Sequence, residues 1–223
     1  MIKLALPKGR LQGEIANFLG ERGMALENYE EGSRSYRPKA PEFPDLSAKV
    51  FQEKDIPIQV AIGNYDLGIC GLDWVDELMV RFPKSSVVKV RALGVGCHEL
   101  WAVTSASSGL LSLQEIQQAS SERTIRIVSE YANLAEAFVF ETRLRCFQVF
   151  PVWGAAAAYL PEKADIALVA NGFKRDLGRR KLKPVALVLK AEAVLIANRD
   201  SFASDDLSRF LTMLNRIGTA RAG

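Results

Sequence analysis

Two cations flank a glycine in the stretch LPKGRL, directly after a short apolar run. The glycine, Gly9, would let a backbone approach an anion closely, and Arg10 offers a planar fork that matches phosphate or carboxylate. Lys8 adds a second positive charge. A loop of this kind between a strand and a helix is typical of anion-binding sites, although cations in such loops also often serve only as solvated surface.

A second polar stretch, YDLGICGLDW, follows the segment DIPIQVAIGN. Asp66 opens an expected strand, and Gly68 and Gly71 would let a ligand or another backbone approach its far end. Asp73 is expected as the N-cap of the next helix, a role that explains it without any chemistry.

A third stretch, SEYANL, lies where an expected strand ends and a helix begins. Polar and aromatic groups at a strand end can orient a planar ring by stacking and hydrogen bonds, which makes Glu130 and Tyr131 candidates. Ser129 and Asn133 are equally well explained as helix caps.

The fourth stretch, ADIALVANGFKRDLGRRKL, begins as an apolar strand and ends as a dense basic run. Gly172 permits a turn after the strand, and Lys174 and Arg175 begin the basic run. This run either grips a phosphorylated ligand or is a solvated loop.

Strand-like runs alternate with helical patterns along the chain, which favours an α/β fold with parallel sheets covered on both faces. One helix is expected from Leu11 with a glycine stop at Gly23, and another from Ser204 with an apolar stripe that includes Leu211. The expected strands are 2–6, 67–70, 87–93, 100–104, 125–129, 147–152, 166–170 and 185–197.

The composition indicates an ordinary globular chain, with 48% hydrophobic and 25% charged residues and a net charge of +3. The three cysteines lack the spacing of metal ligands, and their odd number fits reduced thiols in a reducing cytoplasm. The sequence has a single histidine, His98, so no second histidine is present to form a metal-binding pair, and no nucleophilic triad is visible. The apolar run at the N-terminus is too short for a signal peptide or a membrane span. We therefore expect a cytoplasmic protein that binds neither membrane nor nucleic acid.

In this order and spacing, LPKGRL, DIP with YDLGICGLDWVDE, and SEYANL resemble the short form of the ATP phosphoribosyltransferase family, the catalytic subunit that starts histidine biosynthesis. The resemblance implies two α/β domains similar to type II periplasmic binding proteins, with the active site in the cleft between them. On this pattern, residues 1–92 plus 184–223 form domain I and residues 93–183 form domain II.

The resemblance also implies a reaction that joins N1 of the ATP adenine to C1 of the ribose in phosphoribosyl pyrophosphate (PRPP), with Mg²⁺ as cofactor and release of pyrophosphate. It implies a homo-oligomer and a separate regulatory subunit. By resemblance, Lys8 and Arg10 are catalytic residues that contact phosphate groups together with Gly9, and Asp66, also predicted as catalytic, lines the cleft with Gly68, Gly71 and Asp73. Glu130, Tyr131 and Asn133 would help to seat the nucleotide. Ser129, Gly172, Lys174 and Arg175 are predicted as substrate-binding residues from their positions at or after strand ends, where the two cations would attract phosphate. Asp165 is a possible metal ligand.

In this family, the loop that binds PRPP has an acidic residue, three further positions and then the sequence Thr-Gly-x-Thr. This chain does not have that pattern. Val169 stands where the acid belongs, and Ala156 and Ala157 replace a hydroxyl and a carboxylate upstream. Two hypotheses follow: an active transferase with an unusual loop at 169–181, or a non-catalytic relative that binds a nucleotide, another anion or a protein partner.

Overall fold

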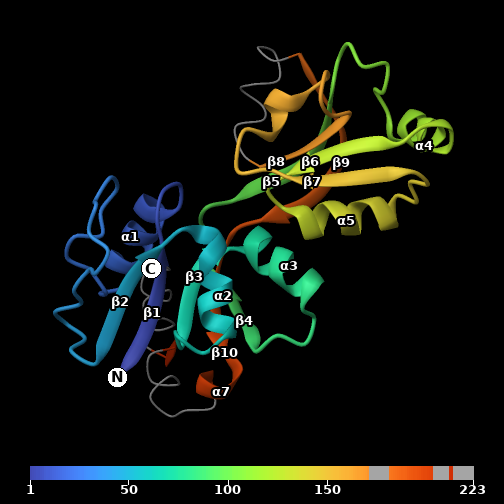
Figure 1. The fold of residues 1–223 in the computed structure, drawn as a ribbon. Coiled ribbons are helices and arrows are strands. Elements are labelled where there is room, and N and C mark those ends of the chain that lie inside the picture. The colour runs from blue at the N-terminus through green and yellow to red at the C-terminus, as the bar shows by residue number, and fades with distance from the viewer. Residues whose placement is uncertain (171–180, 203–210, 213–223) are drawn as a thin grey trace, which may run out of the picture. The chain divides into compact units, whose positions relative to one another are not determined.

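The computed structural model describes residues 1–170, 181–202 and 211–212. The chain divides into two compact units, one of residues 1–78, 82–97 and 192–223, the other of residues 79–81 and 98–191 (Figure 1). The expected domain boundaries lay at 92/93 and 183/184. In the structure the chain changes unit later at both places, and the strand that 183/184 would cut stays whole in the second unit.

The first unit is built on a sheet with the strand order β2-β1-β3-β10-β4. Strands β2, β1 and β3 run parallel, whereas β10 is antiparallel to both β3 and β4. The strands are β1 (Ile2–Pro7), β2 (Leu46–Phe51), β3 (Leu67–Gly71), β4 (Val87–Ala92) and β10 (Ala193–Asn198). The helices are α1 (Gln12–Gly20), η1 (Glu53–Asp55), α2 (Ile56–Ala61), α3 (Leu72–Arg81) and α7 (Arg199–Phe202).

The second unit has the strand order β7-β6-β8-β5-β9. Here β7, β6 and β8 run parallel, and β5 is antiparallel to β8 and β9. The strands are β5 (His98–Ser105), β6 (Ile125–Ser129), β7 (Phe147–Pro151), β8 (Ile166–Ala170) and β9 (Leu182–Ala191). The helices are α4 (Leu113–Glu122), α5 (Ala132–Glu141) and η2 (Ala156–Tyr159).

The α/β class is confirmed, but the expectation of parallel sheets is wrong, because each sheet takes antiparallel strands on one side. The expected single strand 185–197 is two strands, β9 and β10, which belong to different sheets. The chain switches sheets at Glu192, whose backbone carbonyl accepts the Leu72 N–H at 2.9 Å and whose carboxylate accepts the Gly94 N–H at 2.7 Å.

The first core lies between the sheet and α1, where Leu4, Leu6 and Ile15 are fully buried. Helix α1 ends at Gly20, and the turn that follows it contains Gly23 with φ +73°, while the Met24 N–H donates to the Leu19 carbonyl at 2.9 Å. This is the glycine-terminated helix end that the sequence predicts.

Leu211, from the expected C-terminal stripe, packs against the first core. The rest of that stripe lies outside the described residues. Among the helices that the structure describes, none is long and apolar enough to cross a membrane.

Candidate active site at the carboxyl edge of the first sheet

The loop after β1 presents Gly9 at the carboxyl edge of the first sheet. Gly9 has φ +85° and open space around the position of a Cβ, so its backbone is accessible to a ligand. Two buried side chains support the loop. The Tyr29 hydroxyl donates to the Pro7 carbonyl at 2.7 Å, and the Gln12 side-chain oxygen accepts the Gly9 N–H at 3.4 Å.

Arg10 extends from this loop and is held at both ends of its guanidinium. One nitrogen donates to Glu53 Oε2 at 3.1 Å and the other to the Gly96 carbonyl at 3.3 Å. The Arg10 side chain keeps about a third of its surface exposed, at 32%. It is therefore oriented, and it remains accessible to an anion from solvent.

The turn from β3 into α3 lies beside this arginine. A Cβ on Gly71 would lie 2.1 Å from Asp73 Oδ1 and 3.5 Å from an Arg10 nitrogen, so a larger residue would force Asp73 or the turn to move. Asp73 is fully buried in the first turn of α3. The prediction that Asp73 is the N-cap is wrong, because Gly71 takes that position and the helix begins at Leu72.

The buried carboxylates act on the groups around them. Burial raises the pKa of the Cys70 thiol, and the charges of Asp73 and Glu53 raise it further. Burial, together with the charge of Glu53, also raises the pKa of Tyr29. Both groups therefore stay neutral at physiological pH, and the site's charge comes from its carboxylates and from Arg10.

Lys8 points along the same edge toward Tyr36. Its Nζ lies 3.3 Å from the Tyr36 hydroxyl and 4.9 Å from the centre of that ring. The structure thus gathers Gly9, Arg10, Gly71 and Asp73 at one edge, with Lys8 beside them. An arginine fork, an accessible backbone and a helix N-terminus can together bind an anion.

The structure does not bring Asp66 or Gly68 to that edge. Asp66 lies before β3, at the amino edge of the sheet, where its carboxylate accepts the Lys3 N–H at 2.8 Å and the Ser201 hydroxyl at 2.7 Å. A Cβ on Gly68 would meet side-chain atoms of Ile56 and Val60 at 2.6 and 2.9 Å, so this glycine lets α2 pack on the sheet. We assign both residues structural roles instead of the predicted catalytic and binding ones.

In the second unit, Ser129, Glu130, Tyr131 and Asn133 lie where β6 ends and α5 begins. Ser129 is buried, and its hydroxyl accepts the Tyr131 N–H at 2.8 Å. Asn133 was expected before the helix but lies in its first turn, because the helix begins at Ala132. Glu130 is exposed at this carboxyl edge.

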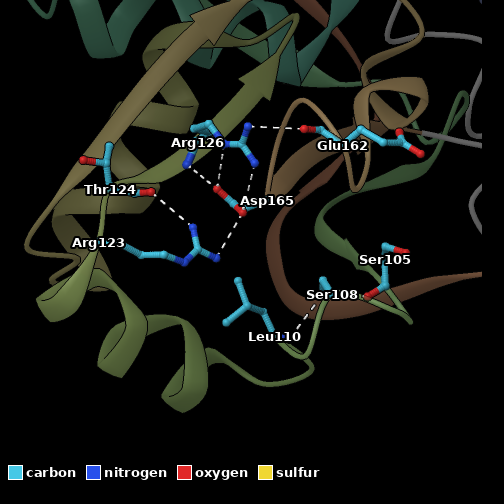
Figure 2. Close-up of polar contacts among 8 residues, drawn as sticks. All are labelled: Ser105, Ser108, Leu110, Arg123, Thr124, Arg126, Glu162 and Asp165. Atoms are coloured by element: carbon cyan, nitrogen blue, oxygen red, sulfur yellow. Dashed lines mark hydrogen bonds and ion pairs between the residues drawn. The ribbon is translucent and has the colours of Figure 1, made fainter.

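Asp165, the possible metal ligand, lies instead at the amino end of β8 and is bound by two arginines (Figure 2). Its Oδ2 accepts the Arg126 backbone N–H at 2.8 Å, and its Oδ1 lies 3.1 Å from Arg123. Burial alone would raise the pKa of Asp165, but the hydrogen bonds from Arg123 and Arg126 outweigh it and hold that pKa below its ordinary value. These contacts explain Asp165 as a structural anion, so the prediction of a metal ligand is withdrawn.

Val169, Ala156 and Ala157, three of the positions that depart from the family's PRPP site, share one apolar cluster. Val169 and Ala157 pack against a buried group that includes Ala156 and Val152. These positions therefore contribute apolar surface. The predicted binding residues Gly172, Lys174 and Arg175 lie outside the described residues.

Sequence reasoning missed Glu53 and Gly96, which orient Arg10. Glu53 follows β2, a strand that the sequence analysis did not predict. The alternation in LSAKVF, with Ala48 and Val50 buried, was the signal that could have found that strand.

Within the described part of the chain, no three carboxylate, histidine or cysteine side chains gather as a metal site. Glu53 is paired with Arg10, and Asp73 and Arg10 both approach the position of a Cβ on Gly71. These residues do not fit a site that holds an ion by protein ligands alone, so we derive no step through a protein-bound metal.

A family model described as ATP phosphoribosyltransferase matches residues 52–218. The chain belongs to the ATP phosphoribosyltransferase family. A relative from Aquifex aeolicus named ATP phosphoribosyltransferase is 30% identical over 96% of this chain and 94% of its own length. One of the same name from Prosthecochloris aestuarii is 27% identical over 91% of this chain, and the chain spans only 65% of its length.

Among solved structures, an ATP phosphoribosyl transferase (HisG:HisZ) complex from Thermotoga maritima matches with a TM-score of 0.76 and 19% identity, over 97% of this chain and 98% of that one. The alkanesulfonate-binding protein SsuA from Xanthomonas axonopodis pv. citri matches with a TM-score of 0.57 and 11% identity, over 97% of this chain and 72% of that one. These likenesses confirm the expected fold class, two α/β units of the periplasmic-binding-protein kind.

Proposed function

We propose that this chain is an ATP phosphoribosyltransferase catalytic subunit. It would transfer the phosphoribosyl group from PRPP to N1 of the ATP adenine and release pyrophosphate, the first step of histidine biosynthesis. The observation that carries the proposal is the oriented arginine at the carboxyl edge of the first sheet, in a chain of this family. The proposal places the chain in the cytoplasm, where ATP is available.

In this reaction the C1–O bond of PRPP breaks, pyrophosphate leaves with the bonding electrons, and adenine N1 forms the new bond to C1. Arg10 would bind leaving-group oxygens through its fork, and the accessible backbone of Gly9 would let those oxygens approach. Lys8 would add charge at the edge of the site. Glu130, Tyr131 and Asn133 would contribute to seating the nucleotide, as polar and aromatic groups at a strand end can.

We propose Mg²⁺ as the cofactor. Mg²⁺ commonly binds substrate phosphates, keeps several waters and takes only one or two protein carboxylates. It would supply charge neutralisation to the pyrophosphate of bound PRPP. We also propose a homo-oligomer with a separate regulatory chain, by analogy with the HisG:HisZ complex whose fold this chain shares.

The test is a calorimetric titration of the purified chain with PRPP and Mg²⁺, because binding can be measured without a regulatory partner. We expect saturable binding that weakens roughly 10- to 100-fold in Arg10→Ala, the effect of losing a charge-assisted hydrogen bond. Arg81→Ala, in the last turn of α3, is the matched control and should bind as the wild type does. A chain that gives no heat with PRPP at millimolar concentration, yet binds ATP, would be the non-catalytic relative.

A further inference from the structure

In the two sheets as described for residues 1–170, 181–202 and 211–212, three of the four edge strands carry charges, as edge strands of natural sheets commonly do. In the first sheet, β2 carries Lys49 and β4 carries Lys89 and Arg91. In the second sheet, β9 carries Lys183 and Lys190. Pairing any of these strands with its own copy would bring like charges together at the new contact.

The fourth edge strand, β7, has the sequence FQVFP and no charged residue. Aromatic side chains around it face solvent: Phe150 is 45% exposed, Phe140 of α5 is 69% exposed, and Trp153 just after the strand is 89% exposed. An uncharged edge with exposed aromatic groups is a surface that a partner strand can cover.

The backbone of β7 shows which of its groups face outward. The Cys146 carbonyl accepts the Ile125 N–H and the Val152 N–H donates to the Ser129 carbonyl, so residues 146 and 152 point toward β6. Because the direction alternates along a strand, the N–H and C=O groups of Phe147 and Val149 point away from the sheet, as does the Pro151 carbonyl. Pro151 has no N–H to offer.

We propose that β7 pairs antiparallel with β7 of a second copy of this chain, around a two-fold axis at Val149. Each Val149 would donate its N–H to the other Val149 carbonyl, and each Phe147 N–H would donate to the Pro151 carbonyl of the second copy. Pro151 uses only its carbonyl in this register, so the Phe147 carbonyl at each end of the contact has no strand donor and stays with solvent. A second copy is the occupant because β7 is self-complementary in charge, whereas each other edge repels itself.

The same register brings apolar groups together on the face of the strand that α5 covers. Phe140 and Phe147 already form an edge-to-face pair with ring centres 5.9 Å apart, on the α5 side of the strand. A two-fold axis perpendicular to the sheet keeps both copies of α5 on that one side, so the exposed Phe140 of each copy is brought toward the contact. Phe150 lies on the opposite side of the strand and pairs there with Gln148 of the second copy. The contact rests on the homo-oligomer of the proposed function and names its surface, and its test does not depend on catalysis, so it can fail while the proposed transferase activity stands.

The first experiment is disulfide cross-linking of Val149→Cys in a background of Cys97→Ser and Cys146→Ser, which removes the exposed native thiols. Directly paired residues have Cα atoms about 5.5 Å apart, within disulfide range. Under mild oxidation we expect most of Val149→Cys to become a covalent dimer. Gln148→Cys is the matched control, because its two copies would lie diagonally at roughly 7–8 Å and should cross-link poorly. Equal cross-linking of the two variants would overturn the register.

The second experiment is sedimentation velocity of the full chain at tens of micromolar. Val149→Lys places two lysines in contact across the axis, so we expect its dimer to dissociate at least tenfold more readily than the wild type. Ser47→Lys, on the already charged edge β2, should leave the dimer unchanged. A wild-type chain that stays monomeric, or a Val149→Lys variant that associates as tightly as the wild type, would overturn the proposal.

Discussion

The order β2-β1-β3-β10-β4 of the first sheet corresponds strand for strand to β7-β6-β8-β5-β9 of the second, and the strand directions correspond too. In each sheet an aspartate also stands directly before the middle strand, which is β3 in the first sheet and β8 in the second. Asp66 accepts the N–H of Lys3, and Asp165 accepts the N–H of Arg126, both at 2.8 Å. The two aspartates thus fasten the amino ends of corresponding strands in the same way.

The carboxyl ends of the two sheets differ. In the first sheet β3 ends in Gly71, beside Arg10 and the buried Asp73. In the second sheet β8 ends in Ala170, and the preceding Val169 packs in an apolar cluster. The same strand arrangement therefore has charged side chains where β3 ends and an apolar cluster where β8 ends, so the two units differ in the residues at these strand ends and not in their topology.

The largest effect is expected from Gly71→Ala, which gives the first sheet the residue that ends β8 in the second. The added Cβ would lie 2.1 Å from Asp73 Oδ1, so Asp73 or the turn must move. We expect kcat/KM for pyrophosphate release to fall at least roughly tenfold and the unfolding free energy to fall by about 1–3 kcal/mol. Gly20→Ala, where a Cβ meets nothing within 4 Å, is the control. Unchanged kinetics in Gly71→Ala would show that this turn does not shape the site.

A smaller effect, on stability alone, should separate the two aspartates. Asp165→Asn removes a carboxylate shared by two arginines and should lower the unfolding free energy in urea by about 1–3 kcal/mol. Asp66→Asn keeps one acceptor oxygen, so it loses the charge and one of the contacts to a backbone N–H and a hydroxyl, and should cost about 1 kcal/mol. If Asp66→Asn were the more damaging change, the arginine pair would contribute little.

Asp165 also predicts a pH dependence. Because its folded-state pKa is lowered, its contribution to stability is fully present above the ordinary aspartate pKa of about 3.9 and is lost as the pH falls through the lower, folded-state pKa. The stability difference between wild type and Asp165→Asn should therefore be constant near neutral pH and shrink in acid. A difference that grows on acidification would contradict this assignment.

The smallest effect is expected at the end of β6. Ser129→Ala removes the buried hydroxyl that accepts the Tyr131 N–H, and should lower the unfolding free energy by about 1 kcal/mol. Ser121→Ala, at an exposed position of α4, should change it by no more than about 0.5 kcal/mol. The N-cap of α5 is Tyr131, so the predicted cap role of Ser129 is wrong, and equal stabilities for the two variants would show that its hydroxyl does not stabilise the turn into α5 either.

Many of the strands and helices could be predicted from the sequence, because each is indicated by a short local pattern of residues. The strands around Leu4 and Ile127 and the glycine end of α1 follow from short patterns of burial and turn residues. Strand direction was predicted wrongly, because the same apolar run serves a parallel or an antiparallel strand. Asp66 and Asp165 were both assigned chemistry, since a sequence shows that a polar residue borders a strand but not which partners it meets.

The candidate site could be predicted only in part for the same reason. Gly9 and Arg10 were found by their spacing after a strand, whereas Glu53 and Gly96 come from distant segments that only the fold brings to Arg10. The role of Gly68 was predicted wrongly, because a glycine that lets a helix pack closely on a strand looks the same in a sequence as a glycine that lets a ligand approach.

His98 and Ala191, the residues at which the chain enters and leaves the second unit, are paired neighbours on β5 and β9. The segment between them is thus a contiguous insertion with both ends about 5 Å apart, the separation of paired strands. A two-residue turn can span that distance. Residues 98–191 therefore form a segment that can be removed as one piece. Joining the flanking chain by such a turn after excision leaves every strand pairing of the first sheet intact, and so does circular permutation at this point.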